Sequence, residues 1–139
     1  MSGRSVPVLA WLRLVRVMQK ISAGGELLMK QHNLNGPTFG MLSEISADEG
    51  LTQQELSTNL LVTKGNVSQL LERLEQNGLV YRQQEGTAKR LFLTEKGREL
   101  VRTILPEHDA YIAKQLRALT PEEQTQLLTL LRKVDKSLD

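Results

Sequence analysis

The stretch TKGNVSQLLERLEQNGLVYR, residues 63–82, decides the fold of this chain. Its apolar residues recur at i, i+3, i+4 and i+7, which is the spacing of one face of an α-helix. These residues are Val67, Leu70, Leu71 and Leu74. The opposite face begins with small and neutral hydrogen-bonding side chains, where an ordinary solvated helix carries a Lys/Glu mixture. The pattern predicts a helix with one face in a core and the other free for contact.

Residues typical of helix caps lie at both ends of this helix. Thr63 is predicted as its N-cap and Gly78 as the C′ residue that ends it. After Gly78 the apolar period changes, and two short strands are predicted at residues 79–84 and 89–93. Residues 85–88, EGTA, form the turn between them.

The surrounding segments complete a recognisable unit. Thr52 and Glu55 form a capping-box pattern at the start of the preceding short helix. That helix meets the next one at a tight turn in residues 60–63, LLVT, so the pair predicts a helix-turn-helix, and the hairpin after it makes the unit winged. Thr94 and Thr120 are predicted N-caps of two further helices.

Two features are expected to interrupt the flanking helices. The first long helix begins at Pro7, predicted at position N1, and Gly24 and Gly25 are expected to kink it. Pro106 is expected to kink or break the helix that follows Thr94.

Two apolar stripes near the chain ends exceed what a small lobe can cover alone. Obligate interfaces between subunits are large and apolar, so the stripes predict a dimer. The predicted interface residues are Val8, Trp11, Leu12, Val15, Leu127, Leu130, Leu131 and Val134.

Composition excludes several classes of function. The 139 residues favour a single domain, and the absence of cysteine excludes disulfides, thiolate zinc sites and thiol redox sensing. No apolar stretch approaches the roughly 20 residues of a membrane span, and Arg13 and Arg16 argue against a cleaved signal, so we expect a cytoplasmic protein without membrane contact. His32 and His108 lack metal-ligand spacing, and no catalytic Ser/His/Asp set or phosphate loop is evident. We therefore expect no metal, no cofactor and no enzymatic activity.

Charge is distributed unevenly along the chain. The net charge is only +2, but residues 63–102 carry eight basic and five acidic side chains. A basic excess in the segment with the polar helix face suits a polyanionic partner.

The motifs together resemble one family. The stretches LTQQELSTNLLVTKGNVSQLLERLEQNGLVYR, residues 51–82, and LFLTEKGREL, residues 91–100, resemble the winged-helix core of the MarR family of bacterial transcription regulators. The resemblance covers about residues 36–102, and the flanking helices match in length and place. It is carried by the combination of Leu51-Thr52, Glu55-Leu56, Arg73-Leu74, Gly78-Leu79-Val80 and Leu93-Thr94-Glu95-Lys96-Gly97.

The resemblance implies a fold and a set of partners. The fold is mainly α with a small β-hairpin wing (α+β), a single domain over residues 1–139. About residues 36–102 form the winged-helix DNA-binding lobe, and about residues 6–33 and 103–139 form dimerisation helices. The implied function is a transcriptional regulator that binds double-stranded DNA as a homodimer on a pseudo-palindromic operator. Many family members are repressors released by small, often aromatic, anions, so a small-molecule effector is also implied.

The wing departs from the family pattern. The family usually carries Asp-x-Arg there, with the arginine in the minor groove, whereas the corresponding positions hold Glu85 and Thr87 in a loop about three residues shorter. Either the wing arginine is absent, or Lys89 or Arg90 has taken its place. Strand alternation points Arg90 outward, so we expect Arg90 to be the wing contact, with Lys89 second. A winged-helix module that binds protein and has lost DNA binding stays open as an alternative.

Side-chain chemistry along the helix agrees with DNA recognition. Gly65 permits close approach to the major groove, Asn66 and Gln69 can pair with adenine, and Ser68 can donate or accept. Cationic side chains and helix starts suit phosphates. The predicted DNA-contacting residues are Thr38, Gln53, Thr63, Lys64, Gly65, Asn66, Ser68, Gln69, Arg73, Arg82, Lys89 and Arg90.

Overall fold

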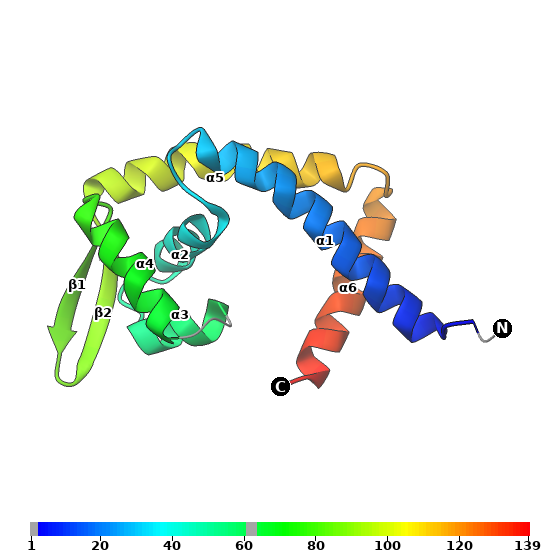
Figure 1. The fold of residues 1–139 in the computed structure, drawn as a ribbon, viewed down its shortest axis with the longest axis horizontal. Helices are drawn as coiled ribbons and strands as arrows, with labels where there is room; N and C mark the ends of the chain where they lie inside the picture. Colours follow the sequence, from blue (N-terminus) through cyan, green and yellow to red (C-terminus); the bar gives the residue numbers. More distant parts are fainter. Residues whose placement is uncertain (1–2, 61–63) are drawn as a thin grey trace. The chain divides into compact units, whose positions relative to one another are not determined.

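The computed structural model describes residues 3–60 and 64–139, without the side chains of residues 64 and 65. The described part contains six helices and one antiparallel strand pair (Figure 1). In chain order these are α1 (Val6–Lys30), α2 (Gly36–Ala47), α3 (Gln53–Leu60), α4 (Lys64–Gln76), β1 (Val80–Glu85), β2 (Ala88–Leu93), α5 (Glu95–Gln115) and α6 (Pro121–Ser137). They belong to two compact units, residues 1–108 and 109–139. The predicted fold class, mainly α with a hairpin wing, is confirmed.

Local hydrogen bonds at the helix starts follow the predicted caps. The Glu55 N–H donates to Thr52 Oγ1 at 3.1 Å at the start of α3, and the Gly97 N–H donates to Thr94 Oγ1 at 3.0 Å at the start of α5. Thr120 and Glu123 form a reciprocal capping box at the start of α6, in the unit of residues 109–139. The predicted N-cap Thr63 lies outside the described residues.

Gly78 ends α4 as predicted. Its φ of +73° is a left-handed conformation that glycine adopts without steric cost. The Gly78 N–H donates to the Glu75 carbonyl at 2.9 Å, and the Leu79 N–H donates to the Leu74 carbonyl at 2.9 Å. This pair of bonds is a Schellman motif, which satisfies two carbonyls at the helix end and turns the chain into β1.

The core of residues 1–108 is formed by the apolar faces of the helices and the inner face of the hairpin. Its buried members are Met41, Leu42, Ile45, Leu51, Leu56, Val67, Leu71, Leu74, Leu79, Val80, Leu91, Leu93 and Val101. A smaller cluster of Met29, Phe39 and Ile104 joins the end of α1 to α2 and α5. The apolar residues that recur at helical spacing in residues 63–82 are therefore the ones that pack α4 against the core.

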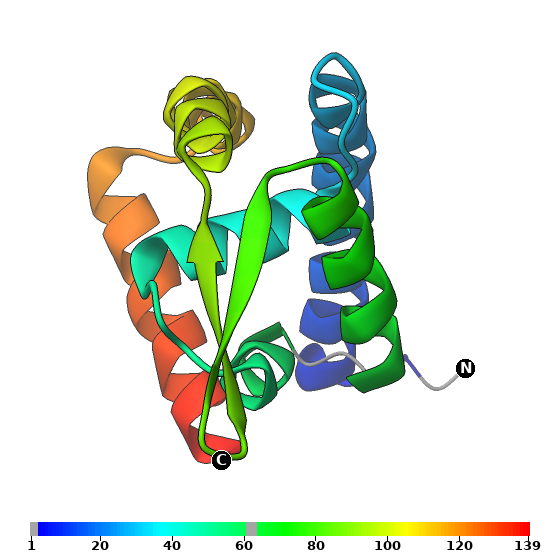
Figure 2. The ribbon, with the colours of Figure 1, turned by 90° about the vertical axis from the view of Figure 1, so that its left-hand side faces the viewer.

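The hairpin is a twisted two-stranded ribbon beside α4 (Figure 2). The register pairs Glu85 with Ala88, so only Gly86 and Thr87 form the turn. Gly86 has a φ of +63° and Thr87 does not share the positive φ, which is the type II′ pattern with glycine in the first turn position. The residues before α3 pair with the outer side of β2, because the Leu91 N–H donates to the Leu51 carbonyl at 2.9 Å. The predicted strands are confirmed to within a residue at each end.

The two predicted interruption sites do not break their helices. Helix α1 runs from Val6 to Lys30 through Gly24 and Gly25, and Pro7 is its second residue, after Val6. Helix α5 is not broken at Pro106 but continues to Gln115. A proline inside a helix removes one backbone hydrogen bond and costs about 3 kcal/mol, and α5 continues past Pro106 despite that cost.

No helix in the described part of the chain is long and apolar enough to cross a membrane.

Candidate nucleic-acid interface

Helix α4 buries one face and exposes the other. Val67, Leu71 and Leu74 are buried in the core, while Asn66, Gln69 and Arg73 are exposed. Gln69 and Arg73 lie one turn apart on the exposed face, so an amide and a guanidinium are presented together. The predicted division of this helix into a core face and an exposed face is thus present in the fold.

The start of α4 is only partly visible. Lys64 and Gly65 are its first two residues, but their side chains lie outside the described part of the structure, as does Thr63. Their predicted roles at the DNA stay predictions.

Three predicted DNA contacts are joined in one hydrogen-bonded network. Gln53, the first residue of α3, donates from Nε2 to Ser68 Oγ of α4 at 2.8 Å. Arg82 of β1 donates from Nη1 to Gln53 Oε1 at 3.3 Å. All three side chains are half-buried. The network therefore ties both helices of the helix-turn-helix to the first strand of the wing.

The Arg82 guanidinium faces the protein, not open solvent. Its Nη2 lies 2.5 Å from Glu75 Oε1 of α4, and its side chain is about one-quarter exposed. That carboxylate oxygen is buried and has no hydrogen bond of good geometry within the described residues, so its charge is balanced by Arg82 alone. In this structure the Arg82 side chain therefore joins the wing to the helix pair, and its predicted phosphate contact stays a prediction.

Arg90 is also engaged within the fold. Its Nε lies 2.6 Å from Glu85 Oε2, and its Nη1 donates to the Gly50 carbonyl at 2.8 Å. Arg90 does lie on the Phe92 side of β2, as strand alternation predicts, but its guanidinium is held between the Glu85 carboxylate of β1 and the Gly50 carbonyl. Lys89 is exposed beside the turn and has no ion pair within the described residues. The structure thus leaves Lys89 more exposed than Arg90, although strand alternation favoured Arg90 for the wing contact.

Thr38 does not present its side chain for contact. It is 3% exposed, and it forms a reciprocal capping box with Asn35 at the start of α2. Its hydroxyl donates to the Asn35 side-chain oxygen at 2.8 Å. The predicted DNA contact through this side chain is dropped, because both its surface and its hydroxyl are used inside the fold.

Glu49 is a residue that the sequence analysis missed. Its carboxylate accepts the Leu93 N–H at 2.9 Å and the Arg98 Nη2 at 3.1 Å, so it links the end of β2 to α5. Partial burial acts to raise the pKa of Glu49, but the Leu93 N–H and the Arg98 guanidinium outweigh it and lower that pKa below its ordinary value. The partners lie 44 and 49 residues away along the chain, so no local pattern indicated this role.

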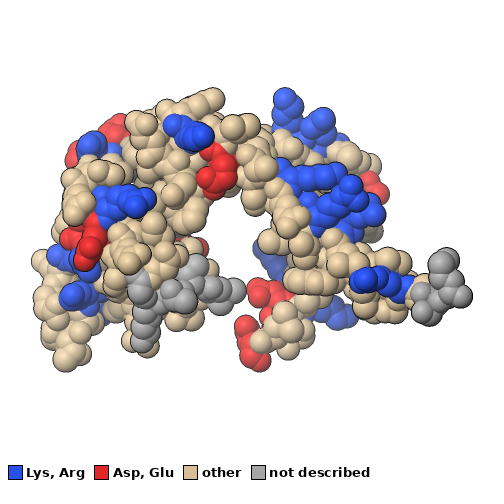
Figure 3. All heavy atoms as spheres, in the orientation of Figure 1, with Lys and Arg blue, Asp and Glu red and all other residues tan. Residues whose placement is uncertain are grey.

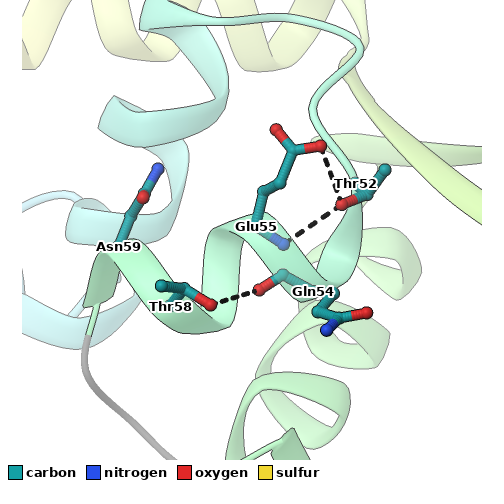
Figure 4. A pocket seen from close by; sticks show the side chains of 5 residues that line it. All are labelled: Thr52, Gln54, Glu55, Thr58 and Asn59. Carbon is teal, nitrogen blue, oxygen red and sulfur yellow. Dashed lines mark hydrogen bonds between the residues drawn. The ribbon is translucent and has the colours of Figure 1, made fainter.

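The outer face of α3 offers hydrogen bonds but no cation. Figure 4 shows a hollow there lined by Thr52, Gln54, Glu55, Thr58 and Asn59. Its hydroxyls are already used, since Thr58 donates to the Gln54 carbonyl at 3.1 Å and Thr52 bonds Glu55. Among the described residues no Lys or Arg lines it, so this part of the hollow does not resemble an anion site.

Charge over the winged-helix lobe is mixed. On the face shown in Figure 3, Lys and Arg side chains alternate with Asp and Glu over the lobe. Placement of individual cations, more than bulk charge, must therefore direct any contact with a polyanion.

The predicted dimer residues lie at the surface of their own units. In α1, Trp11 is 61% exposed, Val8 and Leu12 are also exposed, and Val15 is half-buried. In α6, Leu130 is 61% exposed. There Leu131 and Val134 are also exposed, and Leu127 is half-buried. Each helix thus carries an apolar stripe that its own unit leaves uncovered.

Comparison with known proteins decides the family. A family model described as MarR family matches residues 32–91. An uncharacterized HTH-type transcriptional regulator of Bacillus cereus is 34% identical over 137 residues, covering 98% of this chain and 93% of the relative. The chain belongs to the MarR family.

Solved MarR structures share the fold over nearly the whole chain. AbsC of Streptomyces coelicolor, a MarR family transcriptional regulator, superposes with a TM-score of 0.87 at 23% identity, covering 99% of this chain and 98% of that one. A MarR family protein of Mycobacterium tuberculosis in complex with DNA gives a TM-score of 0.76 at 26% identity, covering 95% and 98%. This MarR protein is therefore a DNA-binding transcriptional regulator of the winged helix-turn-helix type.

Proposed function

We propose that this MarR protein is a repressor that binds a specific double-stranded DNA sequence by inserting α4 into the major groove. This proposal rests on the two faces of α4. The apolar face is buried in the core, whereas Asn66, Gln69 and Arg73 on the opposite face are exposed. A major groove is wide enough for one helix, and amide side chains pair well with adenine edges. The structure of a MarR family protein of Mycobacterium tuberculosis in complex with DNA supports DNA as the partner.

The protein acts as a homodimer through the stripes of α1 and α6. Two copies present two α4 helices, so the operator is pseudo-palindromic with half-sites about one helical turn apart, roughly 10 bp. Because bacterial operators lie on cytoplasmic DNA, the protein works in the cytoplasm.

The deciding experiment is binding to DNA from around its own gene. A gel shift with excess random competitor should show a specific complex, whose footprint should hold two related half-sites. If no DNA from that region or from a random pool is retained, while the folded protein captures a protein partner, the module has lost DNA binding and the proposal is wrong.

Gln69 provides the first prediction. Replacing it with alanine removes an exposed amide aimed away from the core. The loss on the cognate operator should be about 1–3 kcal/mol, with little change on random DNA. Fluorescence anisotropy at one salt concentration measures both. Gln76→Ala, the same change at the last residue of α4, is the matched control. Equal losses on both DNAs would instead assign Gln69 to the phosphate backbone.

Arg73 provides the second prediction. Its guanidinium is exposed and has no ion pair within the described residues, which suits a phosphate contact. Arg73→Ala should weaken binding to all sequences about equally and reduce the slope of log K against log salt by roughly one unit. Titrations at several salt concentrations give the slope. Arg132→Ala in α6 is the control and should leave the slope unchanged. A changed base preference with an unchanged slope would contradict the assignment.

The wing contributes through Lys89. A shallow hollow lies beside this residue between the wing turn and the start of α3, lined by Thr52, Gln53, Gln54, Thr87, Ala88 and Lys89. An exposed cation beside a short turn suits the negative potential of a narrow minor groove. The short turn supports a shallow contact by lysine in place of a deeply inserted arginine.

A small-molecule effector, an aromatic anion, would release the repressor. A hollow between the ends of α1 and α4 and the start of α5 offers apolar surface beside the cation of Lys96. Its lining residues are His32, Asn33, Leu34, Gln76, Asn77, Leu79, Lys96 and Leu100. The test is loss of the DNA complex on titration with a panel of aromatic carboxylates, repeated with Lys96→Met.

A further inference from the structure

The network of Gln53, Ser68 and Arg82 has a defined hydrogen-bond polarity. An arginine side chain carries only donors. Since Arg82 Nη1 lies 3.3 Å from the Gln53 side chain, the atom of Gln53 that faces it must be the oxygen. The amide group of Gln53 is therefore oriented by Arg82, and its nitrogen must face the other way.

That nitrogen faces Ser68. Gln53 Nε2 lies 2.8 Å from Ser68 Oγ, and an amide nitrogen can only donate, so the serine oxygen accepts this bond. A hydroxyl has one hydrogen to donate, and within the described part of the chain the structure gives that hydrogen no acceptor. Ser68 is therefore left as a donor toward its surroundings.

The orientation of the Arg82 guanidinium, and with it that of the Gln53 amide, is fixed by the buried carboxylate oxygen of Glu75. Glu75 Oε1 pairs with Arg82 Nη2 at 2.5 Å and has no other partner within the described residues. Rotation of Arg82 toward solvent would leave that buried carboxylate oxygen unpaired, which is costly. Glu75 and Arg82 thus keep the Gln53 amide from flipping.

Ser68 lies where its hydrogen-bond donor can reach a DNA base. It is half-buried on α4, one residue before exposed Gln69, at the edge of the face proposed to enter the groove. Resting on that proposed function, we infer that Arg82 and Gln53 are positioning residues that make Ser68 an obligate hydrogen-bond donor. Ser68 then selects a base that offers an acceptor in the major groove, such as guanine N7 or O6, and rejects the N4 donor of cytosine.

The test reverses the direction of the hydrogen bond between residue 53 and Ser68 with one near-isosteric substitution. In Gln53→Glu the carboxylate is acceptor-only and pairs with Arg82, so it takes the hydrogen of Ser68 and leaves only lone pairs facing outward. Ser68→Ala removes the hydroxyl altogether. Gln54→Glu adds the same charge at the adjacent, exposed position, whose side chain is outside the network, and is the matched control.

Each purified protein is used to select from a pool of random duplex DNA, and dissociation constants are then measured for the four bases at each position. We expect the wild type to disfavour cytosine at one position per half-site by roughly 2- to 12-fold, the worth of one neutral hydrogen bond. Ser68→Ala should abolish that preference, and Gln53→Glu should turn it toward cytosine. Gln54→Glu should lower affinity for all sequences equally.

Two results would overturn the inference. One is an unchanged preference at every position in Ser68→Ala, and the other is the same profile for Gln53→Glu as for Gln54→Glu. Circular dichroism confirms that each variant is folded before it is scored. If the folded wild type selects no DNA at all, the proposed function fails, and that outcome is distinct from binding with unaltered preference.

Discussion

Trp11→Glu is expected to convert the protein from dimer to monomer at concentrations where the wild type stays dimeric. Trp11 is 61% exposed on α1, within the apolar stripe that its own unit leaves uncovered. A carboxylate buried in an apolar interface costs several kcal/mol, and twofold symmetry places the change twice in each dimer. The loss should reach about 4 kcal/mol or more per dimer, roughly a thousandfold in the dissociation constant.

The measurement is sedimentation equilibrium over a range of concentrations, with a monomer of 15.7 kDa as reference. Gln19→Glu, which adds the same charge at an exposed polar position of α1, should leave the dimer intact. Leu130→Glu on α6 should act like Trp11→Glu, since Leu130 is equally exposed. A wild type that sediments as a monomer, or a Trp11→Glu dimer of undiminished stability, would remove the stripes from the interface.

The proposed dimerisation also determines how the stabilities of variants must be compared. If folding and association are coupled, the melting temperature rises with protein concentration. Variants that weaken the interface will then melt at lower temperature without any change inside the lobe. Stability of the lobe is therefore measured at one fixed concentration for all variants.

Features that depend on neighbouring residues were predictable from the sequence. Gly78 and Thr120 act through bonds to residues at most five positions away, and the helical period of α4 is local by nature. Thr38 was open to the same reasoning but was misassigned. Its reciprocal bonds with Asn35 are a short-range cap that the sequence pattern Asn-x-x-Thr already permits.

Roles that depend on distant partners were not predictable. Arg82 meets Gln53 across 29 residues, and Arg90 meets Gly50 across 40. The alternation of apolar residues in the sequence places each of these arginines on a strand. It does not show whether the guanidinium faces solvent or a backbone carbonyl. Two of the three arginines expected at the DNA, Arg82 and Arg90, thus have partners within the fold, whereas Lys89 is exposed beside the turn.

Gly97 shows how a residue can carry a family resemblance for a reason that only the structure supplies. It lies in the first turn of α5, with a helical backbone that any residue can adopt. A Cβ built there would lie 2.1 Å from the Leu79 carbonyl oxygen. That oxygen accepts the Thr94 N–H at 3.1 Å, so the start of α5 is pressed against the chain just before β1.

Gly97→Ala is therefore expected to lower the free energy of unfolding by about 3 kcal/mol, the upper end of the usual cost of overpacking, because backbone, not a flexible side chain, must move. Helix propensity alone predicts the opposite, a gain of up to about 1 kcal/mol for alanine over glycine. Gly40→Ala separates the two effects: among the described residues, a Cβ at Gly40 in α2 would meet only Leu60 Cδ2 at 3.8 Å, an ordinary contact. Urea denaturation of both variants at one protein concentration should give shifts of opposite sign. If Gly97→Ala stabilised the protein as Gly40→Ala does, the Leu79 carbonyl could move away from the added methyl group at little cost. The close packing of α5 against the chain just before β1 would then not explain why residue 97 is glycine.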